Sequence, residues 1–217
     1  MKKTDTIAHV KEWLEAQWTF ANESPSVIYV AFGTIACLRA EQLIQMADAL
    51  MPYPTIWSLK ATLHKHLPPL FIDDRKHLLL DWAPQRFILS HPATRFFLSH
   101  GGWNSLVECM LAGKPVLVWP WFGDQMPNGF RVEKEFGIGK CMQNTDILHH
   151  QRILSSDEIT SYIKQMFEQE EENIQKAETV QDIFMDAKDN SSQLYFEEIN
   201  KIIDDQVLAR TNKHNNL

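Results

Sequence analysis

Short apolar runs alternate with longer segments of helical periodicity over the first two thirds of the chain. Five short runs predict strands, at 26–32, 54–59, 77–82, 95–100 and 115–119, and the first, rich in β-branched and aromatic residues, suits a strand buried on both faces. Between them, apolar residues recur every three or four positions and predict helices over Arg39–Met51, Trp103–Ala112 and Gln125–Phe136. Strict alternation of strand and helix predicts right-handed crossovers, and therefore an α/β fold with a doubly wound parallel sheet and helices on both faces.

The last third of the chain has a different character. All ten prolines lie at or before Pro127, and all eight glycines lie at or before Gly139. Residues 151–217 contain 7 basic and 14 acidic residues, which accounts for the whole net charge of −7. An acidic segment without helix breakers predicts C-terminal helices. Its acidic run, Glu168–Glu172, predicts a solvated helix face or loop in preference to a cation site.

Composition narrows the class of protein. The 217 residues suit one domain of ordinary globular composition, and the negative charge argues against nucleic acid as a partner. Three scattered cysteines provide no disulfide framework, and the first residues show no secretory signal. No apolar stretch approaches the roughly 20 residues that span a bilayer. These features predict a reduced, cytoplasmic protein.

Unusual residues follow directly after the predicted strands. In an open parallel sheet, ligands bind outside the carboxyl ends of the strands. Gly33 and Thr34 follow the first strand, Trp82–Gln85 the third, His100–Ser105 the fourth and Pro120–Gln125 the fifth. We therefore expect these four clusters to meet at one rim of the sheet and to form a ligand site there.

The cluster after the fourth strand favours an anion. Its glycine pair, Gly101 and Gly102, lets the backbone approach a ligand closely. The helix that begins next offers free N–H groups and the positive end of its dipole. The Ser105-x-x-Glu108 spacing is also that of a capping box, which needs no ligand. The neighbouring His100 and the glycine pair favour the phosphate site over the cap.

The common nucleotide and metal motifs do not occur. No Gly-x-Gly-x-x-Gly follows a strand, and Gly113-Lys114 lacks the flanking residues of a P-loop. A nicotinamide dehydrogenase and a P-loop hydrolase are both disfavoured. The histidine pairs His64/His66 and His149/His150 have no cysteine or carboxylate partners at ligand spacing, so no metal site is expected.

The 44-residue stretch from 82 to 125 carries a dense series of motifs. In order, these are Trp82-Ala-Pro-Gln85, Leu89-Ser-His91, Phe97-Leu-Ser-His-Gly-Gly-Trp-Asn-Ser105, Glu108, Gly113-Lys-Pro115 and Pro120-Trp-Phe-Gly-Asp-Gln125. The series resembles the signature box of UDP-dependent glycosyltransferases, especially the plant secondary-product type. Gly101 stands where the plant enzymes often have cysteine. Outside the box, residues 26–34 resemble the family's preceding strand, and residues 191–196 resemble its final helix.

The resemblance implies one half of a GT-B fold, in which two Rossmann-like domains face a cleft. The chain resembles the C-terminal, donor-binding half, and the N-terminal acceptor domain lies outside it. We therefore divide the chain into a linker leading into the domain (1–25), a Rossmann-like nucleotide-sugar donor-binding domain (26–150), C-terminal helices that complete it (151–206) and a disordered tail (207–217).

The resemblance also implies roles for the rim residues. Trp82 would stack on uracil, the Ala83 backbone would read the base edge, and Glu108 would accept hydrogen bonds from both ribose hydroxyls. The other implied UDP contacts are Thr34, Gln85, His100, Asn104 and Ser105. The implied sugar contacts are Trp103, Asp124 and Gln125, and a glutamine at the end of the box with tryptophan at 103 resembles members that prefer glucose.

The reaction implied by the resemblance is inverting transfer of a hexose from UDP-glucose to a small-molecule acceptor. The UDP-sugar is a co-substrate, and neither a cofactor nor a metal is implied. The family's catalytic base is a histidine of the N-terminal domain, so we expect no catalytic residue in this chain and little transfer by the chain alone. The alternative function is a non-catalytic nucleotide-sugar-binding module or a truncated fragment.

An apolar stripe near the end of the chain predicts a packing surface whose partner the sequence leaves open. Its members are Leu194, Phe196, Ile199, Ile202 and Ile203. In the family the last helix packs on the N-terminal domain, so the stripe either lacks that partner here or folds onto its own domain as core. An uncovered apolar face would favour a homodimer.

Overall fold

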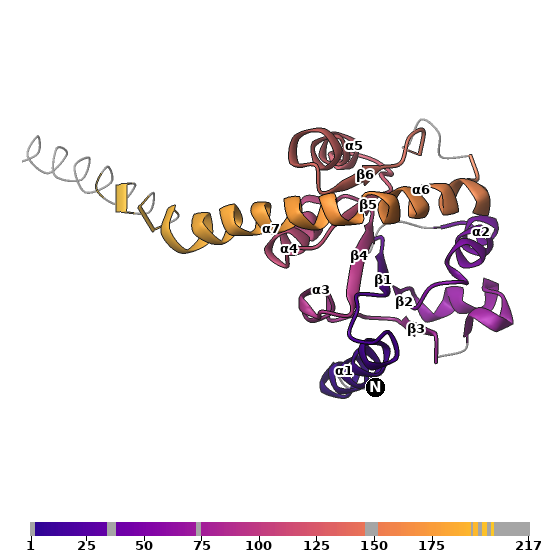
Figure 1. Cartoon of the computed structure of the whole chain (residues 1–217). Coiled ribbons are helices and arrows are strands. Elements are labelled where there is room, and N and C mark those ends of the chain that lie inside the picture. Colours follow the sequence, from indigo (N-terminus) through magenta and orange to yellow (C-terminus); the bar gives the residue numbers. More distant parts are fainter. Residues whose placement is uncertain are drawn as a thin grey trace, which may run out of the picture.

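A six-stranded parallel sheet forms the centre of the molecule (Figure 1). The computed structural model describes residues 3–33, 38–72, 75–145, 152–191, 193–194, 197–198 and 201. The strands lie in the order β3-β2-β1-β4-β5-β6, and every neighbouring pair is parallel. Their bounds are β1 (Val27–Ala31), β2 (Thr55–Ser58), β3 (His77–Leu80), β4 (Thr94–Ser99), β5 (Val116–Val118) and β6 (Gly139–Cys141).

Helices cover both faces of the sheet because successive strand residues point to opposite sides. Tyr29 and Ala31 of β1 belong to one apolar cluster, and Ile28 and Val30 belong to the other. The first cluster is covered by α1 (Lys3–Phe20), α3 (Gln85–Ser90), α4 (Trp103–Leu111), the π-helix η3 (Arg131–Phe136) and α7 (Glu170–Asp186). The second is covered by α2 (Ala40–Leu50), the 3-10 helices η1 (Ala61–His66) and η2 (Pro69–Ile72), and α6 (Ser156–Glu168).

The doubly wound α/β fold is confirmed, and each of the five predicted strands is present with ends shifted by at most two residues. The sixth strand, β6, was not predicted. The helix expected over Gln125–Phe136 is α5 (Gln125–Phe130) followed at once by η3. None of the described helices combines the length and apolar character needed to cross a bilayer.

The segment assigned as a linker, 1–25, contains the 18-residue helix α1. Val10 and Leu14 of this helix are fully buried in the same apolar cluster as Tyr29. Gln17 donates a hydrogen bond to the Arg75 carbonyl (2.8 Å) and ties the helix to the chain just before β3. Residues 3–20 therefore contribute to the core of this domain.

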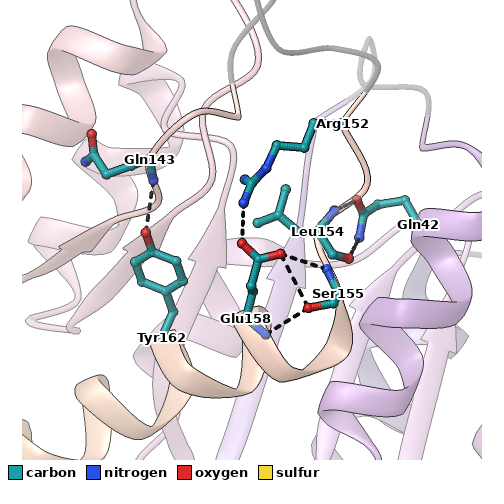
Figure 2. A network of polar contacts seen from close by, with 7 residues as sticks. All are labelled: Gln42, Gln143, Arg152, Leu154, Ser155, Glu158 and Tyr162. Atoms are coloured by element: carbon teal, nitrogen blue, oxygen red, sulfur yellow. Dashed lines mark hydrogen bonds and ion pairs between the residues drawn. The ribbon is translucent and has the colours of Figure 1, made fainter.

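Helix α6 begins at a fully formed capping box (Figure 2). The Ser155 hydroxyl accepts from the Glu158 backbone N–H (3.3 Å), and the Glu158 carboxylate accepts from the Ser155 backbone N–H (3.2 Å). Arg152 pairs with the other oxygen of Glu158. On α2, the Gln42 side chain donates to the Leu154 carbonyl (3.0 Å) and accepts from the Leu154 N–H (2.9 Å). The start of α6 is therefore fixed against α2.

Helix α7 packs along α4 and then extends away from the sheet (Figure 1). Gln181 donates to the Leu111 carbonyl (2.8 Å), which satisfies one of the free carbonyls at the end of α4. Farther along, Ile183 is 61% exposed and Leu194 is 67% exposed. At Leu194 the predicted apolar stripe is therefore not packed on this domain. The other four members of that stripe, and the 207–217 tail, lie outside the described residues.

Candidate functional site

The strand order reverses between β1 and β4, and the candidate site lies at the carboxyl ends of these two strands. Strand β1 runs into Phe32 and Gly33, while β4 runs into His100 and the glycine pair. Ligand sites of open α/β sheets form at such a reversal because the connections leave in opposite directions and open a crevice. The sequence predicted a site at this rim.

The imidazole of His100 lies between Gly33 and Gly102. A Cβ atom on Gly33 would lie 3.2 Å from both Cε1 and Nε2 of His100, and one on Gly102 would lie 2.5 Å from Nε2. Gly33 also has φ +68°, a backbone conformation that favours glycine. The two glycines therefore provide the space for the ring, and Nε2 is among its atoms nearest to both of them.

The environment of His100 favours the neutral ring. Burial lowers the pKa of His100, and the Ala31 carbonyl and the Asp124 carboxylate partly oppose that shift. Its buried Nδ1 atom has no hydrogen-bond partner among the residues that the structure describes.

The amino end of α4 has no side-chain cap. The N-cap residue is Gly102, and the helix begins at Trp103, so Ser105 is already the third helical residue. The capping-box interpretation of Ser105 and Glu108 is therefore wrong, because a cap must precede the helix and Ser105 lies within it. Trp103 and Asn104 are exposed in the first turn, beside backbone N–H groups that no side chain caps.

A polar network joins α4 to the start of α3 and to β1. The Gln85 side-chain amide donates to Glu108 Oε2 (2.9 Å) and to Ser105 Oγ (3.3 Å). The side-chain oxygen of Gln85, Oε1, accepts from the Tyr29 hydroxyl (3.2 Å), and Glu108 Oε1 accepts from Arg86 (2.8 Å). Three predicted site residues are thus in contact, while Tyr29 and Arg86 were not predicted. Tyr29 stands in the middle of a predicted strand, where a tyrosine is normally interpreted as core.

A cavity of about 210 Å³ lies beside this network, at the ends of β1, β2 and β3. Trp82 lines it with 43% of its surface exposed, and Ala83 lines it nearly buried at 9%. Tyr29, Gly33 and Gln85 line the same cavity. An aromatic face at the mouth of a small cavity suits a flat, unsaturated ring.

The start of α5, which follows β5, brings Asp124 and Gln125 to the same end of the sheet. Gln125 is only 5% exposed, and its Oε1 accepts from the backbone N–H groups of Trp121 (2.8 Å) and Phe122 (3.2 Å). Asn128 donates to Asp124 Oδ2 (2.9 Å) and to the Gly101 carbonyl (3.0 Å), linking the start of α5 to the glycine pair. Because Oε1 of Gln125 is occupied by backbone donors, only its Nε2 group is available to a ligand.

One predicted site residue, Thr34, lies outside the described residues. Two larger hollows contain no predicted site residue. One, of about 800 Å³, lies beside β6, and the other, of about 880 Å³, lies near Arg95 at the amino ends of the strands. Among the described residues, no three histidine, cysteine or carboxylate side chains gather in a group that suits a metal ion.

The six-stranded parallel sheet and the helices on both of its faces form one half of the two-domain GT-B architecture. Residues 4–180 match the family of UDP-glucoronosyl and UDP-glucosyl transferases, and the chain belongs to this family. Plant members use a UDP-sugar as co-substrate and require no metal ion.

Curated relatives include anthocyanidin 3-O-glucosyltransferase 7 of Manihot esculenta, 40% identical over 129 residues, which are 58% of this chain and 45% of that protein. UDP-glycosyltransferase 71C3 of Arabidopsis thaliana is 31% identical over 172 residues, 75% of this chain and 35% of the relative. The chain spans less than half the length of these curated relatives.

Solved structures share the fold. UGT71G1 of Medicago truncatula, complexed with UDP-glucose, superposes with a TM-score of 0.78 at 26% identity, covering 94% of this chain and 44% of that one. UGT2 of Phytolacca americana, complexed with UDP-2-fluoro-glucose and pterostilbene, has a TM-score of 0.72 at 27% identity, covering 84% of this chain and 43% of that one.

Proposed function

We propose that this chain is the donor half of an inverting glycosyltransferase and binds UDP-glucose at the rim between β1 and β4. The observation that carries the proposal is the convergence of His100, Ser105 and Glu108 at the point where the strand order reverses. Family membership and the solved UDP-glucose complex of a relative support the same ligand.

The nucleoside occupies the cavity beside Trp82. Uracil stacks on the exposed Trp82 indole, and the Ala83 backbone reads the base edge, which fits a cavity of about 210 Å³. The two ribose hydroxyls donate to the Glu108 carboxylate, with Gln85 beside it. A carboxylate suits a pair of adjacent hydroxyls because it offers two acceptor oxygens.

The diphosphate lies at the amino end of α4. Free N–H groups of the first turn, the Asn104 side chain and the helix dipole favour its negative charge. Ser105 accepts from Gln85, so its own O–H is directed elsewhere and is available as a donor. His100 contributes Nε2, and Thr34, which follows β1 in the sequence, is proposed to assist.

The sugar lies toward the β5 loop. Gln125 donates through Nε2, Asp124 accepts through its carboxylate, and the Trp103 backbone completes the contacts. In the reaction, an acceptor oxygen forms a bond to the anomeric carbon while the bond to the UDP oxygen breaks, and UDP leaves with that electron pair. The developing charge on the β-phosphate is stabilised by the donors of α4 and by His100.

No residue of this chain removes the acceptor proton in this proposal. The base comes from an acceptor-binding domain or subunit, which we propose as the partner, together with a small-molecule acceptor. The second candidate function is a non-catalytic nucleotide-sugar-binding module. Hexose transfer after mixing with an acceptor domain would separate the two.

Calorimetric titration with UDP-glucose, UDP-galactose, UDP-glucuronate and UDP tests the site. UDP-glucose is expected to bind best among the three UDP-sugars.

Trp82→Ala removes stacking worth about 1–3 kcal/mol and should weaken UDP about 5- to 150-fold. Glu108→Ala should weaken all four ligands because it removes the ribose contact. Phe130→Ala, an exposed aromatic residue beside β6, is the control and should leave binding unchanged. Equal heats for the wild type, Trp82→Ala and Glu108→Ala would refute the site.

A further inference from the structure

Tyr29 holds a buried hydroxyl in a fixed position behind the ribose site. The residue lies at the centre of β1, is 1% exposed, and its ring stacks on Phe97 with centroids 4.8 Å apart and an angle of 13° between planes. A ring locked by a strand and by stacking gives its hydroxyl one direction. That hydroxyl donates to the Gln85 side-chain oxygen at 3.2 Å.

The contact with Tyr29 fixes the orientation of the Gln85 amide. With its oxygen facing Tyr29, the Gln85 amide presents Nε2 to Glu108 Oε2 (2.9 Å) and Ser105 Oγ (3.3 Å). The opposite orientation would set the Gln85 oxygen against a carboxylate, which has no proton to donate. The chain of bonds therefore runs in one direction, from hydroxyl to amide to carboxylate.

Glu108 is held from a second side by a much weaker contact. Arg86 donates to Oε1, but its side chain is 84% exposed, so solvent screens the pair. The contact with Gln85 is partly buried and better shielded from solvent, so it is the main constraint on the carboxylate. Burial and the charge of Glu108 both raise the pKa of Tyr29, which keeps its hydroxyl protonated and able to donate.

We infer that Tyr29 is a positioning residue that sets the preference of this site for ribose hydroxyls by orienting Glu108 through Gln85. The inference rests on the proposed function, in which Glu108 accepts from those hydroxyls. A carboxylate that is oriented before binding loses little conformational freedom when the ligand arrives. Without the Tyr29 hydroxyl, the Gln85 amide loses its anchor and the carboxylate its direction.

The test compares UDP with 2′,3′-dideoxyuridine diphosphate, which lacks both ribose hydroxyls. Calorimetry on the wild-type chain is expected to give a clear preference for UDP. In Tyr29→Phe, which keeps the ring and its stacking, the UDP affinity should fall about 3- to 10-fold while the dideoxy ligand binds as before. A general loss of structure would weaken both ligands and leave their ratio unchanged.

Tyr162→Phe is the matched control. The Tyr162 hydroxyl also takes part in one hydrogen bond of 3.2 Å, which it accepts from the Gln143 backbone N–H (Figure 2). It lines the hollow beside β6 and not the candidate site. This variant should keep the wild-type preference for UDP. A preference lowered equally in both variants would overturn the inference.

Two further outcomes separate this inference from the function on which it rests. A wild-type chain that binds neither nucleotide, or binds both equally, overturns the proposed ribose site and the inference together. A wild-type preference that Tyr29→Phe retains in full overturns the inference alone. If Tyr29→Phe does not fold, Gln85→Met cuts the same chain of bonds without altering β1, and full retention of the preference there has the same consequence.

Discussion

Gly102 and His100 are packed so closely that no other residue fits at position 102 without moving the imidazole. A Cβ atom on Gly102 would lie 2.5 Å from Nε2 and 3.1 Å from Cε1 of His100. The backbone of Gly102, at φ −62° and ψ 136°, is open to any residue. Glycine is therefore required at this position for the place of the ring and not for a special backbone conformation.

Gly102→Ala is expected to weaken UDP-glucose binding more than it destabilises the fold. The added methyl displaces the His100 imidazole. Because that ring is the end of a side chain that can rotate away, the unfolding free energy should fall by about 1 kcal/mol or less, at the low end of the cost of overpacking. Loss of a hydrogen bond to a charged phosphate should cost about 1.5–3 kcal/mol, or roughly 10- to 150-fold in affinity. Calorimetry and urea denaturation measure the two effects.

A double-mutant cycle isolates the cause. In a His100→Ala background the side chain that collides with the methyl is gone, so adding Gly102→Ala should change UDP-glucose affinity by less than about 0.5 kcal/mol. If the second substitution weakened binding as strongly as it does in the wild type, the methyl would be acting on the ligand or the helix and not on His100.

Binding of UDP-glucose is expected to strengthen as the pH falls. Burial lowers the pKa of His100 in the free chain below its usual 6.5, and a diphosphate beside Nε2 favours the charged ring and raises that pKa in the complex. The complex then holds more protons than the free chain, so the association constant should rise as the pH drops from about 7.5 to 5.5.

UDP-glucose is the better ligand for this pH series because its diphosphate is esterified at both ends and takes up no proton in that range. Calorimetry in two buffers of different ionisation enthalpy should register proton uptake on binding. In His100→Gln both the pH slope and the uptake should disappear. An unchanged slope in that variant would assign the titration to another group.

The fold class could be predicted from the sequence because the apolar runs of the strands and the three- or four-residue spacing of the helices were long enough to recognise. The strand β6 escaped because it is only three residues, Gly139–Cys141, and its strand geometry comes from pairing with β5. Helix α1 has a buried face that includes Thr6 and Gln17 beside Val10, Trp13 and Leu14, so polar residues interrupt its apolar period.

The site was predicted as a set of residues, but their contacts required coordinates. Ser105-x-x-Glu108 and Ser155-x-x-Glu158 have the same spacing, yet only Ser155 caps a helix. The difference lies in the preceding residues, since Ser155 has an extended backbone while Ser105 is already helical. Likewise, nothing in the order of residues places Tyr29 against Gln85, which is 56 positions away.

Gln42 is expected to contribute strongly to stability although it is a polar residue on a buried helix face. It is 3% exposed and pairs with both backbone polar groups of Leu154 (Figure 2). Gln42→Met keeps the size of the side chain but leaves a buried N–H and C=O unpaired, so the unfolding free energy should fall by about 1–3 kcal/mol or more.

The matched control on the same helix is Gln45→Met. Gln45 is half-buried and accepts one bond, from the Ser156 N–H at 2.8 Å, so its loss should cost about 1 kcal/mol or less. Urea denaturation of both variants makes the comparison. Equal losses would mean that the paired contact of Gln42 with Leu154 adds nothing beyond a single hydrogen bond.

Gln125 accepts hydrogen bonds from the backbone and is the proposed donor to the sugar, and two substitutions distinguish these roles. Its Oε1 accepts from the Trp121 and Phe122 N–H groups, and its Nε2 is the proposed donor to the sugar. Gln125→Glu keeps an acceptor for both backbone groups, so both N–H groups stay paired, but it removes the donor. The ratio of UDP-glucose to UDP affinity should therefore fall about 3- to 10-fold.

Gln125→Ala should lower that ratio and also cost about 1–3 kcal/mol of stability, because two N–H groups lose their acceptor. A Gln125→Glu chain with the wild-type ratio would show that the sugar does not contact this side chain.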